Sequence, residues 1–486
     1  MKKPARSTKR TSSRSSSNQS SGRSFAKPFA KPFERDRSRD SFRRERPEFA
    51  DERERSDERE RPEVAPRQAP VKREAVEKAF NGLWSDLFST PVHLDSALSK
   101  QAKNMKSILA RIVPIILLRP ASQAEAMGIG VPAGEPWKLS PDKLKNWRPA
   151  SVLAQRMYEG MIHRPVQADP VLDDYPSHMT EEWMKEWGNE TAQSLVKALA
   201  NEAPLSLRVS RKFKVADVLK GLKEGSKLPV SAQPSDLSPM GIRLGGYAPV
   251  LHNEWYDQGA FEIQDEGSQV MSYFALWPEL YGSMLSKEPG PAQAPKKLPA
   301  LPKDTAAWTV IDACAGAGGK SLAMADALQG KGRVYAYDTS DKKLLALRRR
   351  AKHAGFNNIQ TLALKEGQEL ESLKRFRRTA QVVLVDAPCS GWGVLRRNPD
   401  IKWRQGEEVL KKMPEIQKRL LALYSDLVAP GGRLVFGTCT FRKAETLDVV
   451  QDFLKNHPDF KAKEGGYLGP DPSDGFFMQA FERTGK

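Results

Sequence analysis

The second half of this chain repeats one pattern, in which an apolar run leads into a turn and then into a helical segment. The first unit, after residue 305, is WTVIDACAGAGGKSLAMADAL, and the second is GRVYAYDTSDKKLLALRRRAKHAG. Two further strands with their turns are VVLVDAPCSG and GGRLVFGTCTF. Strands that alternate with helices specify an open, mostly parallel sheet with helices on both faces. We therefore predict an α/β fold built on a doubly wound sheet.

Reactive side chains follow the predicted strands at the points where these strands end. Asp386 closes VVLVD, a strand typical of one buried on both faces, and Pro388 and Cys389 come next. Cys314 and Cys439 follow two other strands. Ligands bind outside the carboxyl ends of strands in open α/β sheets, so we expect a site at this edge. The alternative is a turn with an inert cysteine, because a Pro-Cys pair alone is a weak signal.

Composition narrows the class of protein. The chain has 486 residues, enough for two or three domains, and its net charge of +18 favours nucleic acid, or secondarily an acidic membrane, as partner. Three cysteines without a CxxC pair favour reducing surroundings, and six scattered histidines form no metal motif. The longest apolar run, residues 108–118, is too short to span a bilayer. We expect a soluble, cytoplasmic, monomeric protein that needs no metal.

Composition and periodicity divide the chain into four regions. Residues 1–70 are rich in Arg and Ser, and we expect a disordered arm that adds RNA affinity or serves only as a solubilising tail. Residues 71–167 carry apolar residues at helical spacing, and residues 168–258 mix helical patterns with a short strand. We predict a helical N-terminal region, then a small α+β RNA-binding domain, then a catalytic domain over residues 259–486.

The turn DACAGAGGK, residues 312–320, follows a strand and opens a helix, where backbone amides can approach a cofactor closely. A nucleotide-triphosphate loop would need glycine in place of Cys314, and a dinucleotide loop would need glycine in place of Ser321. A cofactor with an adenosine ribose and no phosphates remains. S-adenosylmethionine fits, because acidic residues at strand ends can hold its cationic groups. Asp338, at the end of the second strand, can bind the ribose hydroxyls or can simply cap the following helix.

Taken together, these motifs resemble the Sun (Fmu) family of S-adenosylmethionine-dependent RNA cytosine-5 methyltransferases. The likeness runs from about residue 175 to the C-terminus and is looser before that. The motifs that carry it are DACAGAGGK, VDAPCSGWG, RRNPDIKW (396–403), GTCT (437–440), FEIQDEGSQ (261–269) and DGFFMQAF (474–481). The resemblance implies a Rossmann-like methyltransferase core, S-adenosylmethionine as cofactor and RNA as partner.

The family chemistry gives each thiol a role. Carbon 5 of cytosine is a poor nucleophile, so a thiolate must first add to carbon 6 and push electron density to carbon 5. By resemblance, Cys439 is this nucleophile and Cys389 assists release of the methylated product. Asp386 is expected to hydrogen-bond the cytosine ring or the methionine part of the cofactor. Lys320 is expected to support the site electrostatically, since nearby positive charge favours a thiolate.

The resemblance also implies a set of cofactor-binding residues. The set is Cys314, Ala315, Gly316, Ala317, Gly318, Gly319, Lys320, Asp338, Glu366 and Asp386. Glu366 is our choice for the acidic residue expected near the end of the third strand. The chain departs from the family at Ala317, Thr440 and Thr446, where proline, serine and asparagine are usual, and none of these changes removes a reacting atom. For Cys314 we expect packing rather than catalysis.

A basic segment beside the predicted site offers a way to hold RNA. It comprises Arg396, Arg397, Lys402 and Arg404, interleaved with Trp403. We predict that these side chains hold phosphates and stack a base, and the alternative is a solvated basic loop. A stacked base hides its ring face, so the target cytosine must be single-stranded or extruded from its helix.

These inferences converge on methyl transfer to an RNA cytosine, with ribosomal RNA as the expected substrate. A transfer-RNA or DNA cytosine methyltransferase is the alternative within the same class. A noncatalytic RNA-binding factor for ribosome assembly is the alternative from another class. The presence of both Cys389 and Cys439 argues against the noncatalytic factor, because a scaffold has no need of two aligned thiols.

Overall fold

The structure of the chain is a computed structural model. It describes residues 73–89, 94–101, 109, 113, 116, 117, 150, 154, 172–225, 231–245, 249–303, 307–365 and 369–485. The expected disordered arm, residues 1–70, lies outside the described residues, and so does most of the region 71–167. Two helices of that region are described, α1 (Arg73–Ser89) and α2 (Leu94–Ser99). Within the described ranges, no helix combines the length and the apolar character needed to cross a membrane.

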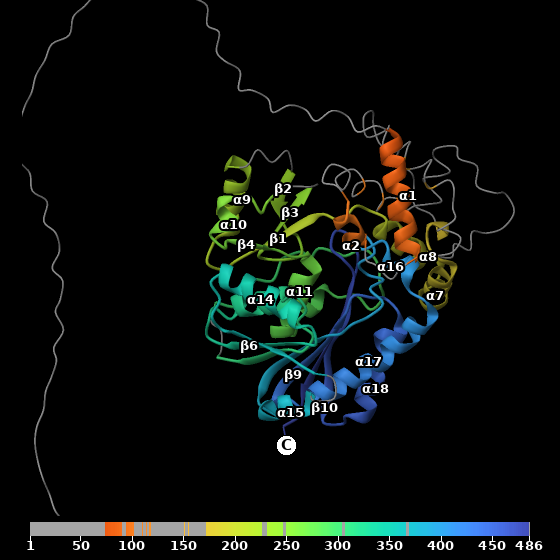
Figure 1. Cartoon of the computed structure of the whole chain (residues 1–486). Coiled ribbons are helices and arrows are strands. Elements are labelled where there is room, and N and C mark those ends of the chain that lie inside the picture. The colour runs from red at the N-terminus through yellow and green to blue at the C-terminus, as the bar shows by residue number, and fades with distance from the viewer. Residues whose placement is uncertain are drawn as a thin grey trace, which may run out of the picture. The chain divides into compact units, whose positions relative to one another are not determined.

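A seven-stranded sheet forms the centre of residues 307–485. Its strands are β5 (Thr309–Asp312), β6 (Arg333–Asp338), β7 (Ile359–Ala363), β8 (Ala380–Asp386), β9 (Val428–Thr438), β10 (Phe460–Leu468) and β11 (Phe476–Arg483). They lie in the order β10-β11-β9-β8-β5-β6-β7. The strands β5 to β9 are mutually parallel, while β10 and β11 pair in antiparallel fashion at one edge (Figure 1). The predicted α/β fold with a mostly parallel sheet is confirmed.

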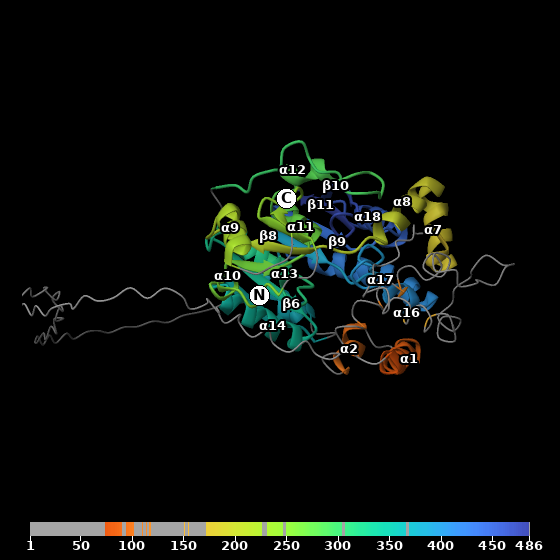
Figure 2. The same ribbon diagram turned by 90° about the horizontal axis from the view of Figure 1, so that it is seen from above.

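Helices cover both faces of this sheet, as a doubly wound fold requires. The helices concerned are α11 (Glu266–Leu276), α13 (Gly319–Ala327), α14 (Asp341–His353), α17 (Glu407–Ser425) and α18 (Leu447–Asn456). Val382 and Leu384 of β8 pack in the same core as α11 and α13, whereas Val383 and Val385 pack with α17 and α18. Successive strand residues point to opposite faces, so the apolar run in β8 supplies both cores. Figure 2 shows α14 and α17 on opposite sides of the strands.

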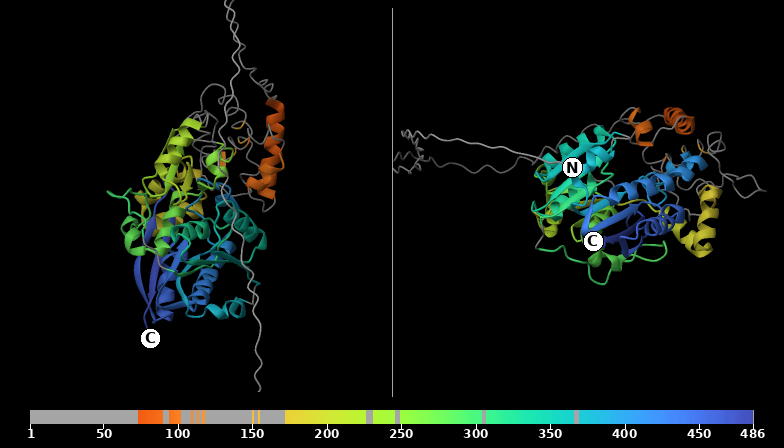
Figure 3. Two further views of the ribbon diagram at one scale, coloured as in Figure 1. Left: turned by 90° about the vertical axis from the view of Figure 1, so that its left-hand side faces the viewer. Right: turned by 90° about the horizontal axis from the view of Figure 1, so that it is seen from below.

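A second, smaller sheet precedes the large one in the chain. Its strands are β1 (Leu205–Val209), β2 (Ser231–Pro234), β3 (Gly241–Gly245) and β4 (Phe261–Ile263), and the helices α9 (Val215–Gly225) and α10 (Glu254–Asp257) accompany it. The strand order is β2-β3-β1-β4 with antiparallel pairing throughout, around a core that includes Leu207, Val218 and Ile242. The sheet and α9 lie beyond one end of the large sheet (Figures 1 and 3).

The border between the two domains differs from the prediction at residue 258. Strand β4 belongs to the small sheet although it lies in the segment that we assigned to the catalytic domain. The helices α7 (Ser177–Trp187) and α8 (Asn189–Leu199), which we assigned to the small domain, bury Trp183 and Leu195 in the core of the large sheet. Spacing of apolar residues indicates that a helix has a buried face, but it does not indicate which core that face enters.

A buried ion pair fixes the small sheet to the domain built on the large sheet. Arg208 of β1 lies 3.0 Å from Asp326 of α13, and their side chains are 1% and 5% exposed. Asp326 also accepts hydrogen bonds from the Ser210 hydroxyl and from the Arg211 amide. Two such charges are tolerated in an interior only when they are well paired, and here the pairing joins the small sheet to the helix that follows the glycine turn.

The remaining elements for which the structure gives bounds are short. They are η1 (Leu172–Asp174), α12 (Pro278–Tyr281), η2 (Gly282–Met284), α15 (Glu369–Leu373), η3 (Lys374–Phe376), α16 (Ile401–Arg404) and η4 (Lys443–Glu445).

Candidate active site

The turns that follow β5, β8 and β9 meet at one edge of the large sheet. The three strands are parallel neighbours, and their register pairs Asp386 with Gly437 and Asp312 with Leu384. Carboxyl ends of parallel strands lie at the same edge, so each strand delivers its following turn to one place. Cys314, Cys389 and Cys439 stand in these three turns.

The structure brings two of the three cysteines together. The sulfur atoms of Cys389 and Cys439 lie 3.3 Å apart, and the backbone amide of Cys439 donates to the Cys389 sulfur at 3.3 Å. Both residues are partly exposed, so the pair can be reached from solvent. Cys314 is also a free thiol, but the structure records no contact between its sulfur and the other two.

The two cysteine turns are tied to each other by hydrogen bonds beside the sulfurs. The hydroxyls of Ser390 and Thr440, each one residue after a cysteine, lie 2.8 Å apart. The Gly393 amide donates to the Cys439 carbonyl at 2.8 Å. A Cβ atom on Gly393 would lie only 3.0 Å from that carbonyl and still closer to Gly475, so this close approach requires glycine.

Lys320, near the start of α13, stands between the glycine turn and the cysteines. Its Nζ lies 2.6 Å from Asp386, at the end of β8, and their side chains are 14% and 26% exposed. Burial opposes the charge of Lys320, but Asp386, Asp312 and negative charge at Cys439 outweigh burial and raise the pKa of Lys320. Lys320 is therefore a fixed cation whose field reaches the Cys439 sulfur.

Cys389 is held as a thiol. Its hydrogen bond with Cys439, followed by burial, raises the pKa of Cys389 well above that of an ordinary cysteine. Negative charge at Cys439 and at Glu445 acts in the same direction. A protonated Cys389 can donate its S–H to the Cys439 sulfur.

The glycine turn holds Asp338, the residue predicted to bind the ribose. Gly316 and Gly318 have φ angles of +55° and +85°, in the left-handed region that favours glycine. One carboxylate oxygen of Asp338 accepts from the Gly316 amide at 2.8 Å, and the other accepts from the Ser340 amide at 2.8 Å. Asp338 thus orients the glycine turn and the residue that caps α14, since the N-cap itself is Ser340. Ribose binding by Asp338 stays a prediction.

Sequence reasoning left Asp312, the last residue of β5, out of the predicted site. Its Oδ2 accepts from the Ser321 hydroxyl at 2.5 Å, whereas its Oδ1 is buried without a hydrogen-bond partner. Burial raises the pKa of Asp312 to about 7. An unpaired buried acceptor beside a glycine turn fits the donor groups of a cationic cofactor. Its position at a strand end was the signal available in the sequence. Glu366, the other acidic candidate, lies outside the described residues.

The basic segment that we predicted to hold RNA is placed differently from that expectation. Arg396 is buried and donates to the carbonyls of Ser473 and Glu202. Arg397 forms ion pairs with Asp265 and Asp474, both at 2.7 Å. These guanidinium groups bond to the protein itself, so their contacts support a structural role in this fold.

The aromatic and lysine members of this segment are also buried. Trp403 is 1% exposed and its indole N–H donates to the Leu117 carbonyl. Lys402 is 1% exposed and donates to the Asp174 carbonyl. Trp403 therefore has no free ring face on which an RNA base could stack. Among the residues that the structure describes, no cluster of three or more His, Cys, Asp or Glu side chains could hold a metal ion.

Comparison with known families agrees with this architecture. Residues 300–475 match the family described as 16S rRNA methyltransferase RsmB/F. Residues 175–251 match the ferredoxin-like domain of RsmF/B-like methyltransferases. The first match covers the glycine turn and both cysteine turns, and the second covers the strands β1 to β3.

Individual relatives are similar over about 60% of the chain. The probable ribosomal RNA small subunit methyltransferase B of Bacillus subtilis is 29% identical over 302 residues, which are 62% of this chain and 60% of that protein. The corresponding protein of Synechocystis is 26% identical over 61% of this chain and 60% of its own length. The chain thus spans about 60% of the length of the curated relatives that it matches.

Solved structures share the fold. The protein PH0851 superposes with a TM-score of 0.60 at 19% identity, over 85% of this chain and 99% of that chain. NSun6 from Pyrococcus horikoshii, solved with SFG, has a TM-score of 0.51 at 16% identity, over 64% of this chain and 99% of its own. At such low identity, these superpositions show a common fold and nothing further.

Proposed function

Over residues 175–251 and 300–475 the chain belongs to the RsmB/F family of methyltransferases, and we propose that it transfers a methyl group from S-adenosylmethionine to carbon 5 of a cytosine in RNA. Ribosomal RNA is the proposed substrate, because the curated relatives carry names of ribosomal RNA methyltransferases. The covalent route through Cys439 and the assignment of individual residues are part of the same proposal.

One observation carries the chemical proposal. The Cys389 and Cys439 sulfurs lie 3.3 Å apart at the carboxyl edge of the sheet, and both are partly exposed there. The Lys320–Asp386 pair lies on the side of the glycine turn. A nucleophile, a hydrogen-bond donor and a fixed cation are therefore grouped where this fold binds ligands.

The residues around the glycine turn fit a cationic cofactor. Burial, followed by the charges of Asp386, Asp312 and Asp338, raises the pKa of Cys314, so the three carboxylates act on the same sulfur. Such a group attracts positive charge, and the buried Oδ1 of Asp312 lacks a donor in the protein. When bound, S-adenosylmethionine supplies a methyl group on a positively charged sulfur. Asp338 would hold its ribose, and Asp312 or Asp386 its methionine part.

The roles of the two thiols follow from their environment. The Cys439 sulfur adds to carbon 6 of cytosine, which makes carbon 5 nucleophilic enough to accept the methyl group. Transfer of the carbon 5 proton to water at the partly exposed cysteine pair then re-forms the ring double bond, and the Cys439 sulfur leaves as a thiolate. Cys389, protonated and 3.3 Å away, can donate a hydrogen bond from its S–H to the departing thiolate. Lys320 stabilises negative charge on Cys439 before attack and after release.

The test is to incubate the protein with labelled methyl donor and with separate pools of ribosomal RNA, transfer RNA and DNA. The proposal expects 5-methylcytosine in ribosomal RNA. If label appeared only in transfer RNA or only in DNA, that nucleic acid would be the substrate in place of ribosomal RNA. Absence of label from every pool, with the cofactor bound, would favour a noncatalytic RNA-binding factor and would contradict the proposal.

A further inference from the structure

Glu445 is a buried acidic residue close to the cysteine turns. The proposed reaction assigns it no role. It is the last residue of η4 and is 0% exposed. Its Oε2 accepts from the Ser390 amide at 2.8 Å and from the Gln417 amide group at 2.9 Å. Its Oε1 accepts from Arg442 at 2.9 Å. Burying a carboxylate is unfavourable unless it is well paired, and the three hydrogen bonds to Glu445 provide that pairing.

Glu445 and Gln417 together hold the backbone on both sides of Cys389. The Ser390 amide, immediately after Cys389, donates to Glu445. The Gln417 side chain, from α17, donates both to Glu445 and to the Pro388 carbonyl, immediately before Cys389, at 2.9 Å. The chain segment that carries the Cys389 sulfur is therefore fixed at its preceding carbonyl and at its following amide.

On its other side, Glu445 is anchored to α7 through Arg442. Arg442 forms ion pairs with Glu445 at 2.9 Å and with Glu182 of α7 at 2.7 Å. Its guanidinium also lies 5.1 Å from the centre of the Trp392 ring. Because Arg442 follows Cys439 closely and Trp392 follows Cys389, the contact between Arg442 and the Trp392 ring joins the two cysteine turns.

Only a carboxylate satisfies the three donors that surround Glu445. The Ser390 amide, the Gln417 amide group and the Arg442 guanidinium all donate, so the residue between them must accept three hydrogen bonds. A glutamine at this position would turn an N–H group toward one of these donors. Negative charge at Glu445 also acts on the nearby thiol, where it contributes to raising the pKa of Cys389.

We propose that Glu445 is a positioning residue that holds the Cys389 thiol against the Cys439 sulfur, so that release of the methylated RNA depends on it. This inference rests on the proposed function. Glu445 itself does not touch the reacting atoms: it acts through the Ser390 amide, through Gln417 and through its charge.

The test compares Glu445→Gln with the unchanged protein in two assays. The first measures, on a denaturing gel, the fraction of protein covalently bound to RNA during turnover. We expect this fraction to rise about tenfold, because product release slows, while methyl transfer in the first turnover changes less than about threefold. The second measures alkylation of Cys389 by iodoacetamide against pH, by mass spectrometry. We expect the alkylation profile to shift to lower pH in the variant, because the pKa of Cys389 falls when the charge is removed.

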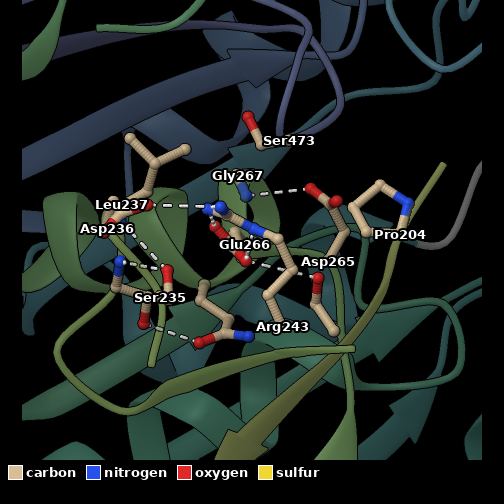
Figure 4. Close-up of polar contacts among 12 residues, drawn as sticks. Pro204, Ser235, Asp236, Leu237, Arg243, Asp265, Glu266, Gly267 and Ser473 are labelled. Carbon is tan, nitrogen blue, oxygen red and sulfur yellow. Dashed lines mark hydrogen bonds and ion pairs between the residues drawn. The ribbon is translucent and has the colours of Figure 1, made fainter. Parts of the chain in front are cut away.

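Glu266→Gln is the matched control. Glu266 is also 0% exposed and pairs with an arginine, accepting from Arg243 at 2.8 and 2.7 Å, but it lies at the junction of α11 with the small sheet (Figure 4). We expect this variant to lose stability while its covalent fraction and its Cys389 alkylation profile stay unchanged. Gln417→Met, which removes only the Gln417 hydrogen bonds, should raise the covalent fraction in the same direction and serves if Glu445→Gln fails to fold.

Failure of the proposed function and failure of the inference about Glu445 give different results. If the unchanged protein forms no 5-methylcytosine, the proposed function fails, and the alkylation assay still tests whether Glu445 acts on Cys389 without any RNA. If the unchanged protein methylates RNA but Glu445→Gln shows neither covalent accumulation nor a shifted alkylation profile, Glu445 only stabilises the fold and the inference is wrong.

Discussion

The turn after β5 and the turns after β8 and β9 each place a cysteine at the same edge of the sheet, but the charges around these cysteines differ. In the first, burial followed by Asp386, Asp312 and Asp338 raises the pKa of Cys314, so this sulfur stays protonated. In the other two, Cys389 and Cys439 face each other, and the field of Lys320 reaches Cys439. Position at a strand end places a cysteine at this edge of the sheet, whereas neighbouring charges govern how readily its sulfur reacts.

The difference also divides the edge into two sides. Carboxylates lie around the glycine turn, where the proposed cationic cofactor would bind. The Cys389 and Cys439 sulfurs lie just beyond the ends of β8 and β9, where the proposed pyrimidine would bind. The Lys320–Asp386 pair connects them, because Lys320 interacts with Asp312 on one side and with Cys439 on the other. Substitutions that change neither Lys320 nor Asp386 should therefore act on one side and leave the other side intact.

The largest expected effect is that of Cys439→Ala. Methyl transfer should fall by at least about 10⁴-fold, because carbon 5 is not activated without addition at carbon 6. The measurement is incorporation of labelled methyl group into ribosomal RNA. Cofactor affinity, measured by calorimetry, should stay at the wild-type value, since the carboxylate side is untouched. A variant that retains more than about a tenth of the activity would show that Cys439 is not the nucleophile.

Cys389→Ala should damage a later step. The first methyl transfer should proceed while repeated turnover falls about 10³-fold, because the Cys439 sulfur leaves without its hydrogen-bond donor. Denaturing electrophoresis should then show protein trapped on RNA, with Cys439→Ala as the control that cannot form the adduct. Trapping by Cys439→Ala and none by Cys389→Ala would exchange the roles of the two thiols.

Lys320→Met should have a smaller effect, of about 10²-fold on the rate of methyl transfer. It removes the cation that favours negative charge at Cys439, and it leaves Asp386 without its partner at 2.6 Å. Lys411→Met is the control, because Lys411 forms an exposed pair with Glu407 and lies in α17. Equal rates for the two variants would show that the field of Lys320 does not matter to the reaction.

Much of this edge could be predicted from the sequence because strand and turn signals are local. VVLVD followed by Pro-Cys, and the glycine turn after β5, are contained in single segments, and parallel pairing brings their ends together. The separation of 3.3 Å between two sulfurs depends on bonds such as Ser390–Thr440, which join residues 50 positions apart. No local pattern contains that information.

The basic segment shows why the rest could not be predicted. Four charged residues in a short stretch are typical of a solvated or RNA-binding surface. The partners of this segment, such as Asp265 and Asp474 for Arg397 and the Leu117 carbonyl for Trp403, come from distant parts of the chain. Glu445 was missed for the same reason, since its role depends on α17 and on the other cysteine turn.

The smallest expected effect is that of Cys314→Ala, which tests the first half of the comparison. The turnover rate should stay within about twofold of wild type and the free energy of unfolding within about 1 kcal/mol, because a single sulfur is removed and no hydrogen bond of the reactive pair is touched. The measurements are the methyl-transfer assay and denaturant unfolding.

Alkylation of Cys314 tests the first half of the comparison in the wild-type protein. Because the pKa of Cys314 is raised by burial and by three carboxylates, this thiol should react slowly with iodoacetamide even at pH 9, where an ordinary cysteine is mostly thiolate. Mass spectrometry of the peptide that contains it measures the rate, with urea-unfolded protein as the control. Fast alkylation of folded Cys314, or a large loss of activity in Cys314→Ala, would mean that the carboxylates do not keep this sulfur inert. The division of the edge into a cofactor side and a thiol side would then be wrong.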